Sequence, residues 1–269
     1  MLKLPRIQLF EFCDQAWLPE TFRTYFHVSL SFSERVFGIF NEAPRIVNNF
    51  MSKTGNSILL DLCSGHGGMV DNLVCVARKK QIKLPKIVLS DIFPNLRGYS
   101  ILQMKHGENS LSYLDKPLSV HELNGTPHKS LMMVFALHHF GPAAATEIIR
   151  NMAREKKNIL ILEGMERSFL TLLLFVLTFP VAVLSFALCG IFVRPASIIG
   201  LVFSILIPII PLMVFFDGVV SILRIYTFKE IEAMLPPEEK ENYSIEYSSF
   251  KTNSILDGYY FQFVYKSGE

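Results

Sequence analysis

The chain has 269 residues and a formal net charge of +2; half of its residues are hydrophobic and only 19% are charged. That length suits one large α/β domain with an appendage, and the small charge argues against a nucleic-acid partner or a strongly acidic substrate. The four cysteines have no metal-ligand spacing, which indicates free thiols in a reducing compartment. No signal peptide is expected, because charges interrupt the N-terminal residues.

The predicted elements describe one sheet that is completed late in the chain. Residues 1–54 mix aromatic and charged side chains at helical spacing, which predicts two or three helices forming a lid. Apolar strands are predicted at 57–61, 86–91, 111–120, 131–137 and 158–164, with helices at 69–81, 95–106 and 142–156. Such alternation indicates a parallel sheet covered on both faces. A helix after residue 226 and two alternating segments, 243–252 and 258–268, predict a terminal hairpin in the same sheet.

The stretch ILLDLCSGHGG (58–68) joins a strand to a helix through a glycine-rich turn. Gly65 and Gly67 let the backbone approach a ligand, and the helix that follows offers free amides. Asp91 ends the next strand, where an acid accepts hydrogen bonds from ribose hydroxyls. Asp61, ahead of the turn, suits a cofactor with a positive amino group and would repel a pyrophosphate. The first interpretation is therefore a site for a nucleoside cofactor with a positive amino group. The alternatives are a site for a nicotinamide dinucleotide and a structural turn without a ligand.

Together with VLSDIFPN (88–95), this stretch resembles the class I S-adenosylmethionine-dependent methyltransferases. The resemblance implies a Rossmann-like seven-stranded, mostly parallel sheet with an antiparallel last strand, and S-adenosylmethionine as the cofactor. It places Asp61, Gly65 and Gly67 beside the methionine part of the cofactor, Asp91 at the ribose and Ile92 against the adenine.

Two positions in this region depart from the family pattern. Cys63 replaces the first glycine of the turn, a change that is tolerable if its φ is negative. Ser119 falls near the place where the family often has an acid that binds the adenine amino group.

A narrower resemblance involves three other segments. ALHHF, the EGMERS segment and the apolar stretch after residue 206 resemble a group of bacterial methyltransferase-like proteins with a hydrophobic C-terminal membrane hairpin.

The candidates for acid–base chemistry follow the fourth and fifth strands. His138 and His139 stand at the carboxyl end of the fourth strand, and an imidazole is a suitable base for a hydroxyl, phenol or amine. His139 is the preferred base; alternatively, one histidine packs beneath the sheet and the other shapes the pocket. Glu163 ends the fifth strand and is predicted to orient a histidine or the substrate, or else to pair with Arg167. No metal is expected, since the histidines form no ligand cluster in the sequence.

A long apolar region separates the fifth strand from the terminal hairpin. The 26 residues 168–193 include no charged side chain, and neither do the 22 residues 195–216 that follow Arg194. As helices they would extend about 39 and 33 Å, against roughly 30 Å for a bilayer core. Because both flanks belong to one sheet, the region must enter and leave a membrane on the same side. A two-helix hairpin, transmembrane or re-entrant, satisfies this; a pair of buried helices in a soluble oligomer is the alternative.

The charges around this region bear on its orientation. Flanking basic residues outnumber Arg194 and place the catalytic side in the cytoplasm; they are Arg154, Lys156, Lys157, Arg167, Arg224 and Lys229. Asp217 and Arg224 lie seven residues apart and share a helix face, which favours a structural ion pair over contact with a lipid headgroup.

The expected organisation has four parts: a lid (1–54), a cofactor domain (55–167), a membrane hairpin (168–216) and a segment that completes the sheet (217–269). The predicted function is a membrane-anchored S-adenosylmethionine-dependent methyltransferase for a lipophilic small molecule. The alternative is a catalytically inactive membrane scaffold of the same fold.

Overall fold

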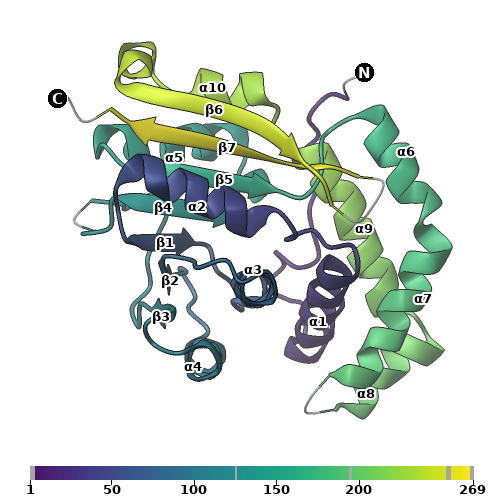
Figure 1. The fold of residues 1–269 in the computed structure, drawn as a ribbon. Coiled ribbons are helices and arrows are strands. Elements are labelled where there is room, and N and C mark those ends of the chain that lie inside the picture. The colour runs from purple at the N-terminus through teal and green to yellow at the C-terminus, as the bar shows by residue number, and fades with distance from the viewer. Residues whose placement is uncertain (1–3, 125, 194–195, 253–255, 267–269) are drawn as a thin grey trace.

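A seven-stranded sheet runs through the computed structural model, which describes residues 4–124, 126–193, 196–252 and 256–266 (Figure 1). Its strand order is β3-β2-β1-β4-β5-β7-β6. The strands are β1 (Ile58–Leu62), β2 (Lys86–Leu89), β3 (Leu111–Tyr113), β4 (Ser130–Val134), β5 (Asn158–Glu163), β6 (Tyr243–Phe250) and β7 (Gly258–Tyr265). β1 to β5 are parallel to one another, and β7 is antiparallel to both β5 and β6. The predicted mostly parallel sheet with an antiparallel last strand is therefore confirmed. β3 is much shorter than the predicted strand 111–120, because polar residues and Pro117 follow it.

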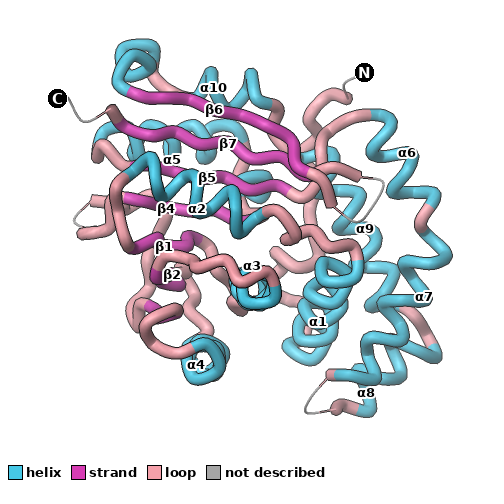
Figure 2. Tube along the Cα trace, in the orientation of Figure 1, coloured by secondary structure: helices cyan, strands magenta, loops and turns pink. Residues whose placement is uncertain are grey.

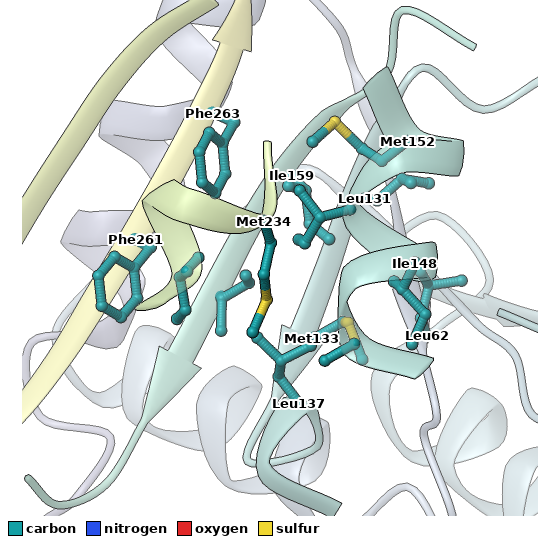
Figure 3. Close-up of a cluster of buried hydrophobic side chains, with 14 of the residues drawn as sticks. Leu62, Leu131, Met133, Leu137, Ile148, Met152, Ile159, Met234, Phe261 and Phe263 are labelled. Atoms are coloured by element: carbon teal, nitrogen blue, oxygen red, sulfur yellow. The ribbon is translucent and has the colours of Figure 1, made fainter. Parts of the chain in front are cut away.

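Helices cover both faces of the sheet. One face carries α2 (Ala43–Thr54), α3 (Gly68–Lys79) and α4 (Leu96–His106), and the other carries α5 (Pro142–Arg154) and α10 (Phe228–Met234). Side chains of each strand alternate between the two cores, so that Leu60 packs towards α5 while Leu59 packs towards α2. Figure 3 shows the core that contains Leu60, to which Met234 of α10 and Met133 and Phe261 of the sheet also belong.

A third apolar cluster joins the N-terminal helix α1 (Glu20–Val36) to the segment between β5 and α10. We call the helical part of that segment the apolar insert: α6 (Phe169–Leu177), α7 (Phe179–Cys189), α8 (Ile198–Leu201), the π-helical turn η3 (Val202–Leu206) and α9 (Ile209–Arg224). The insert stands beside α1 at one end of the sheet (Figure 1). The remaining short 3₁₀ turns are η1 (Leu137–His139), η2 (Gly190–Phe192) and η4 (Pro237–Asn242).

Each half of the predicted hairpin is a bent pair of helical segments and not one continuous helix. Figure 2 shows α6 and α7 as separate helices. Pro180 and Pro208 stand at the two breaks, where a proline cannot donate the backbone hydrogen bond that would continue the preceding helix. Among the described residues no single helix has both the length and the apolarity to cross a membrane. Two pairs, bent by 59° and 68°, meet that test jointly: α6 with α7, and Ile198–Leu206 with α9. Arg194, which separates the two apolar runs of the sequence, lies outside the described residues, as does Pro195.

Candidate cofactor and substrate site

The acid that ends β1 is buried and only partly satisfied. Asp61 is 2% exposed, and its Oδ2 accepts a hydrogen bond of 2.5 Å from the hydroxyl of Ser64. Its other carboxyl oxygen, Oδ1, has no hydrogen-bond partner among the described residues. Burial raises the pKa of Asp61 to about 7, the Ser64 hydrogen bond opposes that shift, and the nearby Asp91 adds to it. A buried carboxyl with a free oxygen is a suitable partner for a ligand ammonium group.

The glycine-rich turn uses positive φ at three alternate positions. Gly65 and Gly67 have φ of +53° and +79°, as glycines can adopt without strain. Cys63 has φ of +60°, so the condition of a negative φ at this position is not met. A side chain in the left-handed region costs roughly 1–2 kcal/mol. No atom lies within 4 Å of the place where a Cβ on Gly65 would stand, so the turn leaves open space there.

The acid that follows β2 holds the turn. Oδ2 of Asp91 accepts from the amide of Gly65 at 2.8 Å, and its Oδ1 accepts from the amide of Phe93 at 2.9 Å. The neighbouring Ile92 is 51% exposed and therefore open to a flat apolar ligand group. The amide of Leu118 donates to the carbonyl of Asp91, which brings Ser119 to the same edge of the sheet. The residues predicted to bind the cofactor thus gather along the carboxyl ends of β1 and β2.

Helix α1 covers the turn from the other side. The imidazole rings of His27 and His66 lie 4.1 Å apart, centroid to centroid. A Cβ on Gly68, the first residue of α3, would lie only 2.6 Å from Oγ of Ser31. The helix from the predicted lid therefore closes directly over the N-terminus of α3.

A buried histidine–glutamate pair lies at the ends of β4 and β5. Nδ1 of His138 is 2.9 Å from Oε2 of Glu163, and both side chains are almost fully buried. Glu163 thus contacts a histidine, which is the arrangement that the first of its predicted roles requires. The alternative partner, Arg167, pairs with Glu230 at 2.7 Å instead. With Nδ1 held by the carboxylate, Nε2 is the ring nitrogen of His138 that remains for a ligand.

The second histidine faces acids from the N-terminal segment. Nδ1 of His139 lies 3.0 Å from Asp14 and 3.1 Å from Glu11, at ion-pair distance but without the direction of a hydrogen bond to either. Burial by itself lowers the pKa of His139, but the two carboxylates outweigh it and raise the pKa above its usual value. The ring of His139 stacks on that of His138, with centroids 4.4 Å apart. The two carboxylates therefore stabilise the protonated form of His139, which makes its imidazole less suitable as a general base.

The charged residues of α9 bind the N-terminal segment rather than each other. Arg224 pairs with Glu11 at 3.2 Å and with Asp14 at 3.1 Å. Asp217 accepts from the amides of Phe12 and Cys13 at 2.8 and 2.9 Å. The expected ion pair between Asp217 and Arg224 is therefore wrong, because both side chains are used to hold residues 11–14 against the insert.

The residues that pair with Arg224 also belong to a cluster of potential metal ligands. Glu11, Cys13, Asp14 and His139 bring four ligand-type atoms within 4.8 Å of one another. A cation at this place would compete with the guanidinium of Arg224, which already compensates the acids.

An apolar cavity of about 480 Å³ lies between the sheet edge, α1 and the insert. That volume falls in the range of small-molecule sites. The sheet edge contributes Phe135, His138, His139 and Glu163, α1 contributes Phe26, Leu30 and Glu34, and the insert contributes Phe175, Phe186 and Val214. Met69, one residue after Gly68, also lines the cavity and so connects it to the glycine-rich turn.

Three residues of the predicted lid make contacts outside the cavity. Arg23 donates to the carbonyls of Cys13 and Gln15, Trp17 packs on Phe12, and Asp14 pairs with Arg224. None of Asp14, Trp17 and Arg23 is among the residues that line the described cavity.

Sequence reasoning missed Glu34, although it left a signal. Phe26, Leu30 and Glu34 follow one another at four-residue spacing, so a carboxylate ends an apolar helix stripe. Glu34 is 4% exposed and lines the cavity.

No protein-family model and no curated protein matches this sequence. Among solved structures, magnesium protoporphyrin IX methyltransferase from Synechocystis, with bound S-adenosylhomocysteine, has a TM-score of 0.46 and 13% identity, covering 85% of this chain and 84% of its own. An O-methyltransferase family protein from Burkholderia thailandensis has a TM-score of 0.45 and 15% identity, over 86% and 59%. Human N-acetylserotonin methyltransferase, in complex with S-adenosylmethionine, has a TM-score of 0.42 and 11% identity, over 81% and 51%. The chain therefore spans little more than half the length of the last two. At such scores and identities these likenesses carry no argument about chemistry, which rests on the site itself.

Proposed function

We propose that this chain is an S-adenosylmethionine-dependent methyltransferase that acts on a lipophilic small molecule at a membrane. The observation that carries the proposal is the continuity of the site. The glycine-rich turn with its unsatisfied Asp61 oxygen leads through Met69 into an apolar cavity whose wall holds the His138–Glu163 pair.

The residues present fit this cofactor. The free Oδ1 of buried Asp61 is a partner for the ammonium of the methionine part, and the open space over Gly65 admits a ligand close to the backbone. Asp91 retains lone pairs for ribose hydroxyls, and exposed Ile92 offers a surface for the adenine. When bound, the cofactor supplies a methyl group on a sulfonium, which is a good leaving group.

The protein supplies the base and the dry surroundings. Nε2 of His138 accepts the proton of the acceptor group, and Glu163 stabilises the imidazolium that forms. His138 is the proposed base because Glu163 holds its Nδ1, whereas Nδ1 of His139 faces the two carboxylates of Glu11 and Asp14. The aromatic and aliphatic walls exclude water, which strengthens the interaction between His138 and Glu163.

The apolar insert supports a membrane location. Together with the residues that connect its helices, it exposes large apolar side chains that a soluble monomer rarely presents together; they are Phe169, Leu170, Leu173, Val176, Leu177, Phe179, Val181, Leu184, Leu188, Ile191, Ile198, Ile199, Ile205, Leu206, Ile207, Ile209 and Leu212. The bent helix pairs favour a re-entrant dip over a full crossing. The catalytic side then lies in the cytoplasm, for which exposed Arg154, Lys156 and Lys229 are the support. Arg167, Arg224 and Lys157 are buried, so their charges do not contribute to this orientation.

The enzyme proposal is tested with the full chain in detergent. We expect saturable binding of labelled S-adenosylmethionine, its loss on changing Asp61→Asn, and methyl transfer to a component of a membrane lipid extract that His138→Asn abolishes. Wild-type protein that binds no cofactor refutes the proposal. Binding without transfer to any extract favours the inactive scaffold.

The membrane location has its own test, flotation with phosphatidylcholine vesicles. Leu206 and Met104 are both 75% exposed, but Leu206 lies in the insert and Met104 on α4. We expect Leu206→Asp to reduce flotation and Met104→Asp to leave it unchanged. Equal flotation of the two variants contradicts insertion through this surface.

A further inference from the structure

One carboxyl group lies in an otherwise apolar part of the cavity wall. Glu34 ends the stripe of α1 that contains Phe26 and Leu30, and all three side chains line the cavity. Glu34 is 4% exposed. Neither the glycine-rich turn nor the His138–Glu163 pair makes use of it. A buried carboxyl without such a use requires an explanation, because its desolvation is costly.

The partner of this carboxyl is fixed by its neighbours. The guanidinium of Arg35 is a donor only, and its Nε donates to Oδ1 of Asn72. The amide of Asn72 is thereby oriented, so that its Nδ2 donates to the carbonyl of Ser31 at 3.2 Å and to Oε2 of Glu34 at 2.8 Å. Oε2 of Glu34 is therefore an acceptor, and a proton on this carboxyl belongs on Oε1.

The other oxygen of Glu34 is unsatisfied. Oε1 is buried and has no hydrogen-bond partner among the described residues. The guanidinium of Arg35 forms its ion pair with Asp71 at 2.9 Å and makes no hydrogen bond to Glu34 among those described. Burial raises the pKa of Glu34 to about 8, although the Asn72 hydrogen bond and the charge of Arg35 oppose the shift. At neutral pH the carboxyl is thus mainly protonated, with its O–H on the unsatisfied side.

We propose that Glu34 contacts the occupant of the cavity and donates a hydrogen bond from Oε1–H to an uncharged carbonyl oxygen of that molecule. The site then selects lipophiles that carry a neutral oxygen acceptor. Plain hydrocarbons are disfavoured because they leave Oε1 unpaired, and carboxylates because they must be desolvated beside the acids Glu11 and Glu163, which also line the cavity. The inference rests on the proposed function only in taking this occupant to be the methyl acceptor.

The test uses three probes with the same ring: 2-acetylnaphthalene, which has a neutral acceptor, 2-ethylnaphthalene, which has none, and 2-naphthoate, which is charged. Binding is measured by equilibrium dialysis of the full chain in detergent without cofactor. For wild type we expect a preference for the ketone over the ethyl compound, and the weakest binding for the carboxylate. Comparing this preference between variants cancels the different hydration of the probes.

Two variants decide the role of the side chain. Glu34→Gln keeps an acceptor for Asn72 and a donor for the ligand, so it should retain the preference for the ketone. Glu34→Leu has no donor, and the preference should fall about fivefold, the size of one net hydrogen bond. Thermal melts of both variants establish that they are folded.

The opposite results overturn the inference. An unchanged preference in Glu34→Leu means that the side chain does not touch the occupant, and an equal loss in Glu34→Gln means that it acts as a carboxylate. Wild type that binds none of the probes also refutes it. None of the probes has a hydroxyl or amine to methylate, so a chain that shows the expected preferences but transfers no methyl group contradicts the proposed function alone.

Discussion

The turn residue Cys63 gives a prediction whose sign depends on its backbone conformation. At φ of +60° the side chain costs roughly 1–2 kcal/mol, which Cys63→Gly removes. Two effects of the substitution are destabilising. The greater freedom of glycine in the unfolded chain costs about 0.5–1 kcal/mol, and the lost contacts of the half-buried thiol cost less. The free energy of unfolding should therefore stay equal or rise by up to about 1 kcal/mol. Cys63→Ala keeps the strain, loses the sulfur, and should be less stable than wild type.

Thermal melts followed by circular dichroism in detergent measure the difference. At about 2–4 °C per kcal/mol for a chain of this size, the glycine variant should melt up to about 3 °C above wild type and the alanine variant below it. Cys75 in the middle of α3 is the control, because there glycine should be about 1 kcal/mol less stable than alanine. An alanine variant at position 63 that melts above the glycine variant refutes the reasoning about strain.

Three further perturbations have definite expected results. Asp61 has its pKa raised to about 7, so between about pH 4 and 7 the unfolded chain ionises it while the folded chain does not, and stability falls as pH rises. Without cofactor, the melting temperature of Asp61→Asn should thus equal that of wild type below pH 4 and exceed it most above pH 7. A difference in melting temperature that does not change with pH contradicts this. Arg224→Ala removes the guanidinium that pairs with the buried Glu11 and should lower the free energy of unfolding by about 3–5 kcal/mol, whereas loss of the exposed Arg45 should cost less than about 1 kcal/mol, both measured by chemical denaturation. Glu163→Ala removes the partner of His138 and should slow methyl transfer by at least about tenfold without weakening cofactor binding; an unchanged rate would exclude this pair from the chemistry.

The sheet could be predicted from the sequence because buried parallel strands are continuous apolar runs that stand out locally. Strand β5 is an example, since all six of its residues are buried. The glycine-rich turn was recognisable for the same reason, as its residues are neighbours in the chain. The φ of Cys63 was not, because it depends on how the turn closes onto Asp91 from another strand.

Long-range pairing explains the other differences. Arg224 and Asp14 are 210 positions apart, and nothing local in either segment indicates that they meet. Glu34 became a candidate only when the insert closed the cavity over its helix. The breaks in the insert were visible as prolines, but which of them bend the helices depends on packing.

The place of the insert in the chain also governs how the protein is made. The edge of β5 is completed by β7, yet about 95 residues separate the end of one strand from the start of the other. At the usual speed of translation this is a delay of about 5–20 s, during which the edge of β5 is open and the apolar helices leave the ribosome. The helices of the insert are therefore synthesised before β7 can pair with β5. During biosynthesis, packing or membrane insertion of these helices accordingly precedes completion of the sheet.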